Sequence, residues 1–432
     1  MAELSKRIGL LDTENAFKIG PKIRAIEDSG KKVITCNLGE PDFPVPGFIK
    51  DEVKRQIDLD NTHYCDPQGI LSLRHAVARH FQQTRGVDAD PRRVVVFPGG
   101  KPPIGLSQEA YCDPGDEVIY PSPGYPIYES FTRYVGARPV PVHLKEESGF
   151  TLSGSDVASA ITRRTRMIFL NFPSNPTGGV ASREQLEDIA AVIREKSSPD
   201  VRVYSDEVYE DILFDGARHQ SIISSPGMEK LTILVSGASK SFSWTGGRIG
   251  WALFPTIEEA EVFKNLNINY FSCVSPYNQE GARLGLESPL AGPAIRTMVE
   301  AFQERRDLIV QGLSSIPGIR CQKPGGAFYV FPNVRGVCEH LGILDACRSL
   351  PVDVRKMTTP STLLQMFLLF EYQVATMDRK SFGRIGTEDM HFLRISIATD
   401  MESLKQAVAR IGEAAQDVKG FKRFIEKGEN LF

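Results

Sequence analysis

The sequence predicts an α/β fold with a mostly parallel sheet, followed by a mixed α+β region. Strand-like and helix-like segments alternate between Val94 and Phe254, which is typical of a parallel sheet with helices on both faces. After Ala301 the pattern changes to a long charged helix, a Pro-Gly-Gly turn and a mixed tail. At 432 residues the chain is long enough for two domains.

The elements before this alternation are short. Residues 1–15 are polar and predict an arm, and 16–30 predict a helix that ends at Gly30. A strand-like run, 33–38, comes next. Glycine and proline then predict two turns, at 39–43 and 63–69. Apolar spacing predicts two helices, at 51–57 and 71–81.

Six short apolar runs predict the strands of the central sheet: Val94–Phe97, Glu117–Tyr120, Met167–Asn171, Arg202–Ser205, Leu231–Val235 and Ile249–Leu253. Ser182 and Gln185 are spaced as a capping box and predict the start of a helix between two of these strands. Leu186, Ile189 and Ile193 then recur at helical spacing and give that helix an apolar face.

Composition excludes several classes of protein. A formal charge of −3 gives no case for a nucleic-acid or polybasic membrane surface. The seven cysteines are scattered without a CxxC pair, so we expect neither a disulfide framework nor a metal site, and a reducing cytoplasm. The N-terminus lacks a signal-peptide core, and the most apolar run, Leu363–Phe370, is too short to span a bilayer, so no membrane association is expected.

The stretch from Ser236 to Trp251 carries the strongest chemical signal. It follows Leu231–Val235, a run that predicts a buried strand, and it contains two cations, Lys240 and Arg248, in a small, polar, glycine-rich segment. A desolvated lysine can stay partly uncharged and form a Schiff base with a carbonyl cofactor, and arginine can hold a phosphate with its planar fork. The same two residues would also suit an ordinary solvated turn.

Four more motifs lie at the carboxyl end of a predicted strand or shortly after it. Pro98–Pro103 places glycines before a helix, where phosphate can bind. The others are Ser122–Tyr128, the Asn175-Pro-Thr-Gly178 string, and Tyr204–Tyr209 with Asp206 at the end of a strand. Taken singly, each also suits an ordinary turn, pocket or helix cap.

Together these motifs resemble the class I, fold-type I aminotransferases that use pyridoxal phosphate, and especially the bacterial-type aspartate aminotransferases. The resemblance runs from about Phe17 to Thr399, with Trp244 and Gly237 as departures from the family pattern. It implies a fold-type I architecture: a large cofactor domain with a mostly parallel sheet flanked by helices, and a smaller α+β domain. The expected division is an arm at 1–15, a large domain at 46–300, and a small domain from 16–45 and 301–432.

The resemblance also assigns site residues. Lys240 would hold the cofactor and act as the catalytic base, Asp206 would pair with its pyridine nitrogen, and Tyr125 would stack on its ring. Asn175 and Tyr209 would bond its phenolic oxygen, Arg394 would bind the substrate α-carboxylate, and the turn at Gly39 would lie beside it. The remaining cofactor contacts would come from residues around the phosphate: Gly100, Lys101, Ser239 (or Ser236), Arg248, and Tyr64 from the neighbouring subunit of a homodimer.

The implied reaction moves an amino group between an amino acid and a 2-oxo acid in a ping-pong cycle. Lys101 suggests an acidic donor such as aspartate, paired with 2-oxoglutarate, because a neutral side chain would leave this cation unpaired in a closed site. Lys101 facing solvent or the phosphate is the alternative, as in enzymes for alanine or aromatic amino acids. A β-lyase on the same cofactor stays open, because cofactor motifs do not fix the reaction. Segment 333–372 is expected to form extra helices.

Overall fold

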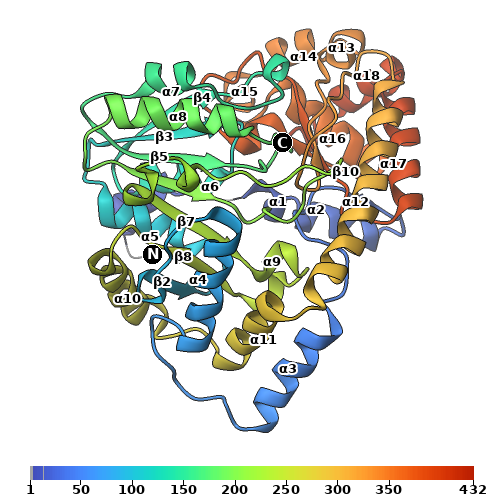
Figure 1. Cartoon of the computed structure of the whole chain (residues 1–432). Coiled ribbons are helices and arrows are strands. Elements are labelled where there is room, and N and C mark those ends of the chain that lie inside the picture. Colours follow the sequence, from blue (N-terminus) through green and yellow to red (C-terminus); the bar gives the residue numbers. More distant parts are fainter. Residues whose placement is uncertain (1–2, 13) are drawn as a thin grey trace.

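A seven-stranded sheet forms the centre of the computed structural model, which describes residues 3–12 and 14–432 (Figure 1). Its strands lie in the order β2-β8-β7-β6-β5-β3-β4. Their bounds are β2 Val94–Phe97, β3 Glu117–Ser122, β4 Arg138–His143, β5 Thr165–Asn171, β6 Arg202–Asp206, β7 Thr232–Gly237 and β8 Gly250–Leu253. Only β8 runs antiparallel to its neighbours, so the prediction of a mostly parallel sheet is confirmed.

One strand of this sheet, β4, was missing from the sequence prediction. Its sequence holds Pro139 and Pro141, which cannot donate to a ladder and argue against a strand. The strand pairs with β3 alone and lies at the edge of the sheet, where prolines are tolerated.

Helices cover both faces of the sheet (Figure 1). The helices in this part of the chain are α3 Gly47–Asp58, α4 Leu71–Arg85, α5 Pro102–Tyr111, α6 Pro126–Tyr134, α7 Gly154–Ala160, α8 Arg183–Lys196, α9 Ala238–Ser241, α10 Ile257–Phe271, α11 Pro276–Glu287 and α12 Ala291–Ser314. Of these, α12 packs mainly on the smaller region described next. The predicted capping box is present at the start of α8, where Ser182 and Gln185 satisfy each other's backbone N–H groups.

The two ends of the chain meet in a second, smaller region. A three-stranded antiparallel sheet, in the order β11-β12-β9, consists of β9 Tyr329–Val330, β11 Met377–Asp378 and β12 Leu393–Ser396. Beside it β1, Ile34–Thr35, pairs in parallel with β10, Val374–Ala375. The predicted strand 33–38 therefore has only two residues in a ladder.

Helices surround these small sheets on the side that carries the orange and red part of the ribbon in Figure 1. They are α1 Asn15–Lys18, α2 Gly20–Asp28, α13 Arg335–His340, α14 Ile343–Ser349, α15 Val352–Met357, α16 Pro360–Tyr372, α17 Met401–Ala414 and α18 Val418–Lys427. One hydrophobic cluster joins Ile23 and Ile34 to Phe302, Leu363 and Phe421, so both ends share a core. The exact domain boundaries stay a prediction.

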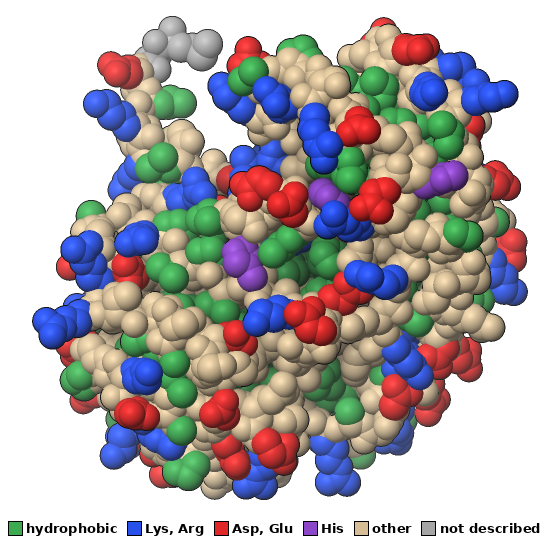
Figure 2. All heavy atoms as spheres, turned by 90° about the horizontal axis from the view of Figure 1, so that it is seen from above, with side chains coloured by type: hydrophobic (Ala, Val, Ile, Leu, Met, Phe, Trp, Pro, Cys, Tyr) green, Lys and Arg blue, Asp and Glu red, His purple; other side chains and the backbone are tan. Residues whose placement is uncertain are grey.

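Segment 333–372 folds as helices α13 to α16, as expected. Its apolar run lies in α16, where Leu363 to Leu369 are all buried. In the part of the chain that the structure describes, no helix is both long and apolar enough to cross a membrane. Figure 2 shows Lys and Arg side chains interspersed with Asp and Glu across the face it presents.

Candidate active site

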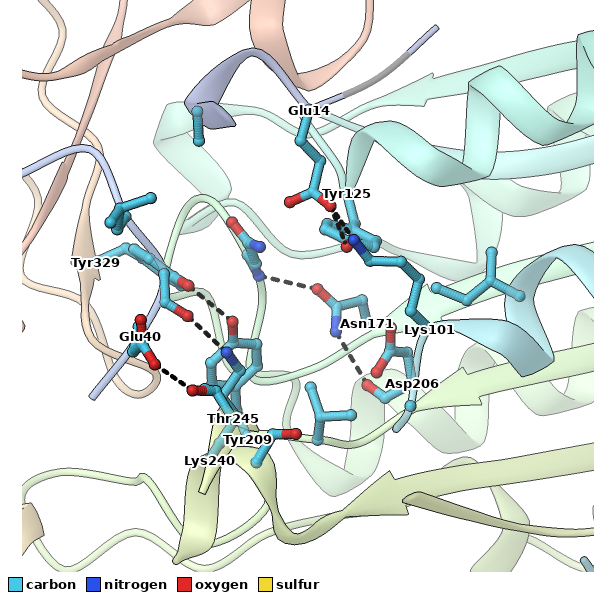
Figure 3. Close-up of a pocket in the computed structure, with 18 of the residues that line it drawn as sticks. Glu14, Glu40, Lys101, Tyr125, Asn171, Asp206, Tyr209, Lys240, Thr245 and Tyr329 are labelled. Atoms are coloured by element: carbon cyan, nitrogen blue, oxygen red, sulfur yellow. Dashed lines mark hydrogen bonds and ion pairs between the residues drawn. The ribbon is translucent and has the colours of Figure 1, made fainter. Parts of the chain in front are cut away.

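A cavity of about 440 Å³ opens where β5, β6 and β7 end at their carboxyl ends. The carboxyl ends of parallel strands share one edge of a sheet, so loops from distant parts of the sequence converge there. All but one of the predicted site residues line it: Gly39, Gly100, Lys101, Tyr125, Asn175, Asp206, Tyr209, Ser239, Lys240, Arg248 and Arg394. Figure 3 shows five of them, Lys101, Tyr125, Asp206, Tyr209 and Lys240, around the cavity on several elements.

Lys240 lies on the short helix α9, directly after β7. Its Nζ donates a hydrogen bond of 2.6 Å to the carbonyl oxygen of Gly39, so the predicted 39–43 turn meets the lysine. The pKa of Lys240 is lowered to about 8, chiefly by burial; the charges of Glu14 and Glu40 oppose this shift, and those of Arg394 and Arg248 add to it. An appreciable fraction of this amine is therefore uncharged near neutral pH and able to react as a nucleophile.

Asp206 ends β6 and is buried. The hydroxyl of Tyr128 donates to its Oδ2 over 2.6 Å, whereas its buried Oδ1 accepts no hydrogen bond from any residue that the structure describes. Burial raises the pKa of Asp206 to about 6. A buried carboxylate oxygen without a donor suits a ligand that brings its own N–H group, such as a protonated pyridine ring. Tyr128 stood in a quoted motif but had been given no role.

The 98–101 turn and Arg248 form the end of the cavity at which a phosphate could bind, which we call the phosphate end. The Arg248 guanidinium donates to the carbonyl oxygens of Thr245 and Pro98, at 2.8 and 3.1 Å. Gly99 has φ +95°, and a Cβ there would lie 2.3 Å from Arg248 Nη2, so this turn requires glycine. Ser236 is buried and donates to Glu210, which leaves Ser239, on the cavity wall, as the hydroxyl available to a phosphate.

Arg394 and two tyrosines form the opposite wall. Arg394 Nη1 donates to Asn175 Oδ1 over 3.1 Å, and its guanidinium lies 4.6 Å from the centre of the Tyr329 ring. The hydroxyls of Tyr329 and Tyr209 are 2.8 Å apart. A Cβ on Gly39 would lie 2.2 Å from the Tyr329 hydroxyl, so glycine is needed for this close approach. No role of Tyr329 was predicted from the sequence.

Glu14 is a second residue that the sequence analysis missed. It lies in the segment expected to be only an arm, and its Oε1 accepts hydrogen bonds from Lys101 Nζ and, over 2.8 Å, from the Tyr125 hydroxyl (Figure 3). Lys101 therefore has an anionic partner within the chain, which the sequence analysis did not consider. The two residues are 87 positions apart, so no local pattern connects them.

A buried ionic network supports the site from behind. Arg85 donates to Glu207 at 2.8 Å and to Glu210 at 2.5 Å, and all three side chains are at most 4% exposed. Glu207 and Glu210 directly follow Asp206 and Tyr209, so the network fixes the chain that carries both site residues. Both glutamates stood in or beside a quoted motif, but their partner, Arg85, is more than 120 positions away.

Tyr64 is the one predicted site residue that the cavity does not include. Its side chain is 88% exposed, and its contact with a neighbouring subunit stays a prediction. Within the described residues, no group of three or more His, Cys, Asp and Glu side chains is arranged to hold a metal ion.

The comparisons with known proteins agree with this geometry. The family model Aminotransferase class I and II matches residues 31–411. A probable aspartate/prephenate aminotransferase of Aquifex aeolicus is 36% identical, over 96% of this chain and 99% of that protein. Aromatic-amino-acid aminotransferase 2 of Thermococcus litoralis is 31% identical, over 96% and 99%. The crystal structure of an aspartate aminotransferase from Rhizobium meliloti matches with a TM-score of 0.85 and 32% identity, over 96% and 99%.

Proposed function

The chain belongs to the class I and II aminotransferase family, and from that premise we propose that it transfers an amino group from an acidic amino acid to a 2-oxo acid with pyridoxal 5′-phosphate as cofactor. One arrangement carries the proposal. One cavity contains a lysine with a pKa of about 8, an aspartate oxygen that accepts no hydrogen bond from the described residues, and an arginine suited to a carboxylate.

The residues of this cavity fit the cofactor. Asp206 Oδ1 would accept the pyridine N–H, and Arg248, Ser239 and the 98–101 turn would hold the phosphate. Tyr209 and the Asn175 amide would lie at its phenolic oxygen. When bound, pyridoxal phosphate supplies a carbonyl carbon for the substrate amine and a ring that withdraws electrons from the substrate Cα.

Each remaining residue then has a task that its position allows. Arg394 binds the α-carboxylate with its planar fork, and the backbone at Gly39 lies beside it. Lys240 Nζ would take the proton from the substrate Cα, for which an amine with a pKa near 8 is well suited. The buried network behind β6 keeps Asp206 and Tyr209 in position.

We also propose that the enzyme works as a homodimer in the cytoplasm. Tyr64 is exposed and lies outside its own cavity, which suits a residue that contacts the neighbouring subunit. All seven cysteines are free, as in a reducing compartment.

The proposed reaction is tested by spectroscopy of the purified holoenzyme. The wild-type protein should absorb in the visible, aspartate should bleach that band, and 2-oxoglutarate should restore it. A Lys240→Ala protein should bind the cofactor but lose transamination by several orders of magnitude, because the base at Cα is gone.

Two results would contradict this reaction. Release of pyruvate from the amino acid without any need for a 2-oxo acid would indicate a β-lyase instead. A higher kcat/KM for alanine or phenylalanine than for aspartate would exclude the acidic donor as the preferred substrate.

A further inference from the structure

The ion pair between Glu14 and Lys101 lies where the side chain of a bound substrate would be recognised. Both residues line the same cavity as Lys240 and Arg394, and Figure 3 shows them on the wall that also carries Tyr125. Glu14 accepts from the Lys101 ammonium and from the Tyr125 hydroxyl through one carboxylate oxygen. The chain thus places its own carboxylate on the cation that a substrate's distal carboxylate would need.

The backbone around Glu14 is anchored on both sides. The N–H of Asp12 donates to Ser130 Oγ over 2.8 Å, and Ser130 Oγ donates back to the Asp12 carbonyl oxygen over 2.9 Å. Asn15 Nδ2 donates to Ser381 Oγ over 2.9 Å. Glu14 is the N-cap residue of α1, but its side chain caps no backbone N–H of that helix. The Glu14 carboxylate is therefore not used as a helix cap and lines the cavity.

This pair is solvated enough to open and close. The side chains of Lys101 and Glu14 are 45% and 18% exposed. The Arg85–Glu207 pair, at 3% and 2%, would leave a buried charge unpaired if it opened. Partly exposed ion pairs are worth about 1 kcal/mol or less, so the Glu14 side chain can leave Lys101 when another anion takes its place.

An aminotransferase must accept two different side chains in one site, one from each substrate. We propose, on the basis of the function proposed above, that Glu14 is an exchangeable counter-ion for Lys101, which lets one subsite take both a dicarboxylate and an amino acid with a neutral side chain. When the side chain is neutral, Glu14 pairs with Lys101 and no cation is left without a partner. When the substrate carries a distal carboxylate, that group takes Lys101 and Glu14 turns toward solvent.

The proposal predicts opposite effects on two classes of ligand. In Glu14→Gln the competing charge is gone, so a dicarboxylate should bind about three- to ten-fold more tightly. A ligand with a neutral side chain should bind equally or less tightly, because Lys101 then lacks an anion. Adding Lys101→Gln to Glu14→Gln should abolish the gain for the dicarboxylate.

Glu40→Gln is the matched control. Glu40 lines the same cavity and, like Glu14, raises the pKa of Lys240, but it accepts a hydrogen bond from Thr245 and does not contact Lys101. Removing its charge changes the potential of the cavity without freeing Lys101. It should therefore shift the ratio of the two affinities much less than Glu14→Gln does, by only the amount that follows from the second charge of a dicarboxylate.

The experiment measures the Kd of two unreactive ligands for each holoenzyme by calorimetry: succinate as the dicarboxylate, and 3-phenylpropanoate as the analogue with a neutral side chain. We expect the ratio of the two Kd values to shift toward succinate in Glu14→Gln and to shift much less in Glu40→Gln. An unchanged ratio, or weaker succinate binding, in a Glu14→Gln protein with wild-type Tm would overturn the proposal. The visible band and its response to aspartate in the wild type test the proposed function separately, so either idea can fail without the other.

Discussion

At the scale of single residues, burial sets the chemistry of two opposite charges in the cavity. Desolvation lowers the pKa of Lys240 to about 8 and raises the pKa of Asp206 to about 6, so in each case it favours the neutral form. Both groups can also bind a ligand. The Lys240 amine is partly buried beside the Gly39 carbonyl, and one oxygen of Asp206 accepts no hydrogen bond from any described residue. The site is prepared for a ligand with an electrophilic carbon and an N–H cation.

The lowered pKa predicts how Lys240 reacts as pH changes. About a quarter of the Lys240 amine is neutral at pH 7.5 if its pKa is 8, against about 0.1% for a lysine with a pKa of 10.5. Labelling of the cofactor-free protein by trinitrobenzenesulfonate, followed by peptide mass spectrometry, should therefore rise for Lys240 with a midpoint near pH 8. Solvated lysines should follow near pH 10.5.

Arg394→Met provides the variant for this measurement. It removes a neighbouring positive charge that helps to lower the pKa of Lys240, so the labelling midpoint should move to higher pH. A wild-type midpoint above pH 10 would show that the cavity does not desolvate the amine.

At the scale of elements, the close contact between β8 and the 98–101 turn positions the phosphate end of the site. Gly250, the first residue of β8, is paired with Phe97 of β2 and with Gly237 of β7. A Cβ on Gly250 would lie 2.4 Å from the carbonyl carbon of Gly99, which is backbone and cannot rotate away. The absence of a side chain thus lets Arg248 and the turn face the same part of the cavity.

Gly250→Ala should separate β8 from this turn. Overpacking of this kind costs about 1–3 kcal/mol of unfolding free energy, measurable by urea denaturation, and should also raise the Kd for pyridoxal phosphate. The control is Gly246→Ala in the same segment, because a Cβ there has no atom within 4 Å. Equal effects of the two substitutions on stability and cofactor affinity would disprove the role of the close contact.

At the scale of the whole molecule, the cavity draws residues from nearly the full length of the chain. Glu14 and Gly39 come from the N-terminal end, Lys240 from the middle and Arg394 from the C-terminal end. Both ends also share one hydrophobic core, so the folding of the small sheets and the completion of the site depend on each other. Tyr64 is exposed, and in the proposed homodimer it would contact the cavity of the second copy of the chain.

Mixing two defective variants tests whether subunits share their sites. Tyr64→Phe and Lys240→Ala should each lower activity. A heterodimer of the two would contain one intact site, with Tyr64 from one chain and Lys240 from the other. An equal mixture, unfolded and refolded together, should recover up to about a quarter of wild-type activity, because half the dimers are mixed and one site in two is intact. No recovery, or a monomer in sedimentation, would contradict a shared site.

The sequence by itself determined the family, the main strands and most of the residues that were expected to line one cavity and do so. Periodic apolar runs specify strands locally, Ser182 and Gln185 specify a helix start, and the residues that follow parallel strands meet because those strands end at one edge. The motifs around Lys240, Asp206 and Asn175 were recognisable for this reason. The resemblance that they suggested is confirmed by the match over residues 31–411.

Only the tertiary structure decided the rest. Strand β4 forms despite two prolines because it lies at the edge of the sheet. The hydrogen bond from Tyr128 to Asp206, the contact of Tyr329 with Tyr209, and the pair of Glu14 and Lys101 join residues that are 78, 120 and 87 positions apart. No local period or spacing encodes such partners, because packing of the whole chain brings them together. The charge that a substrate side chain meets in this cavity is therefore a property of the fold.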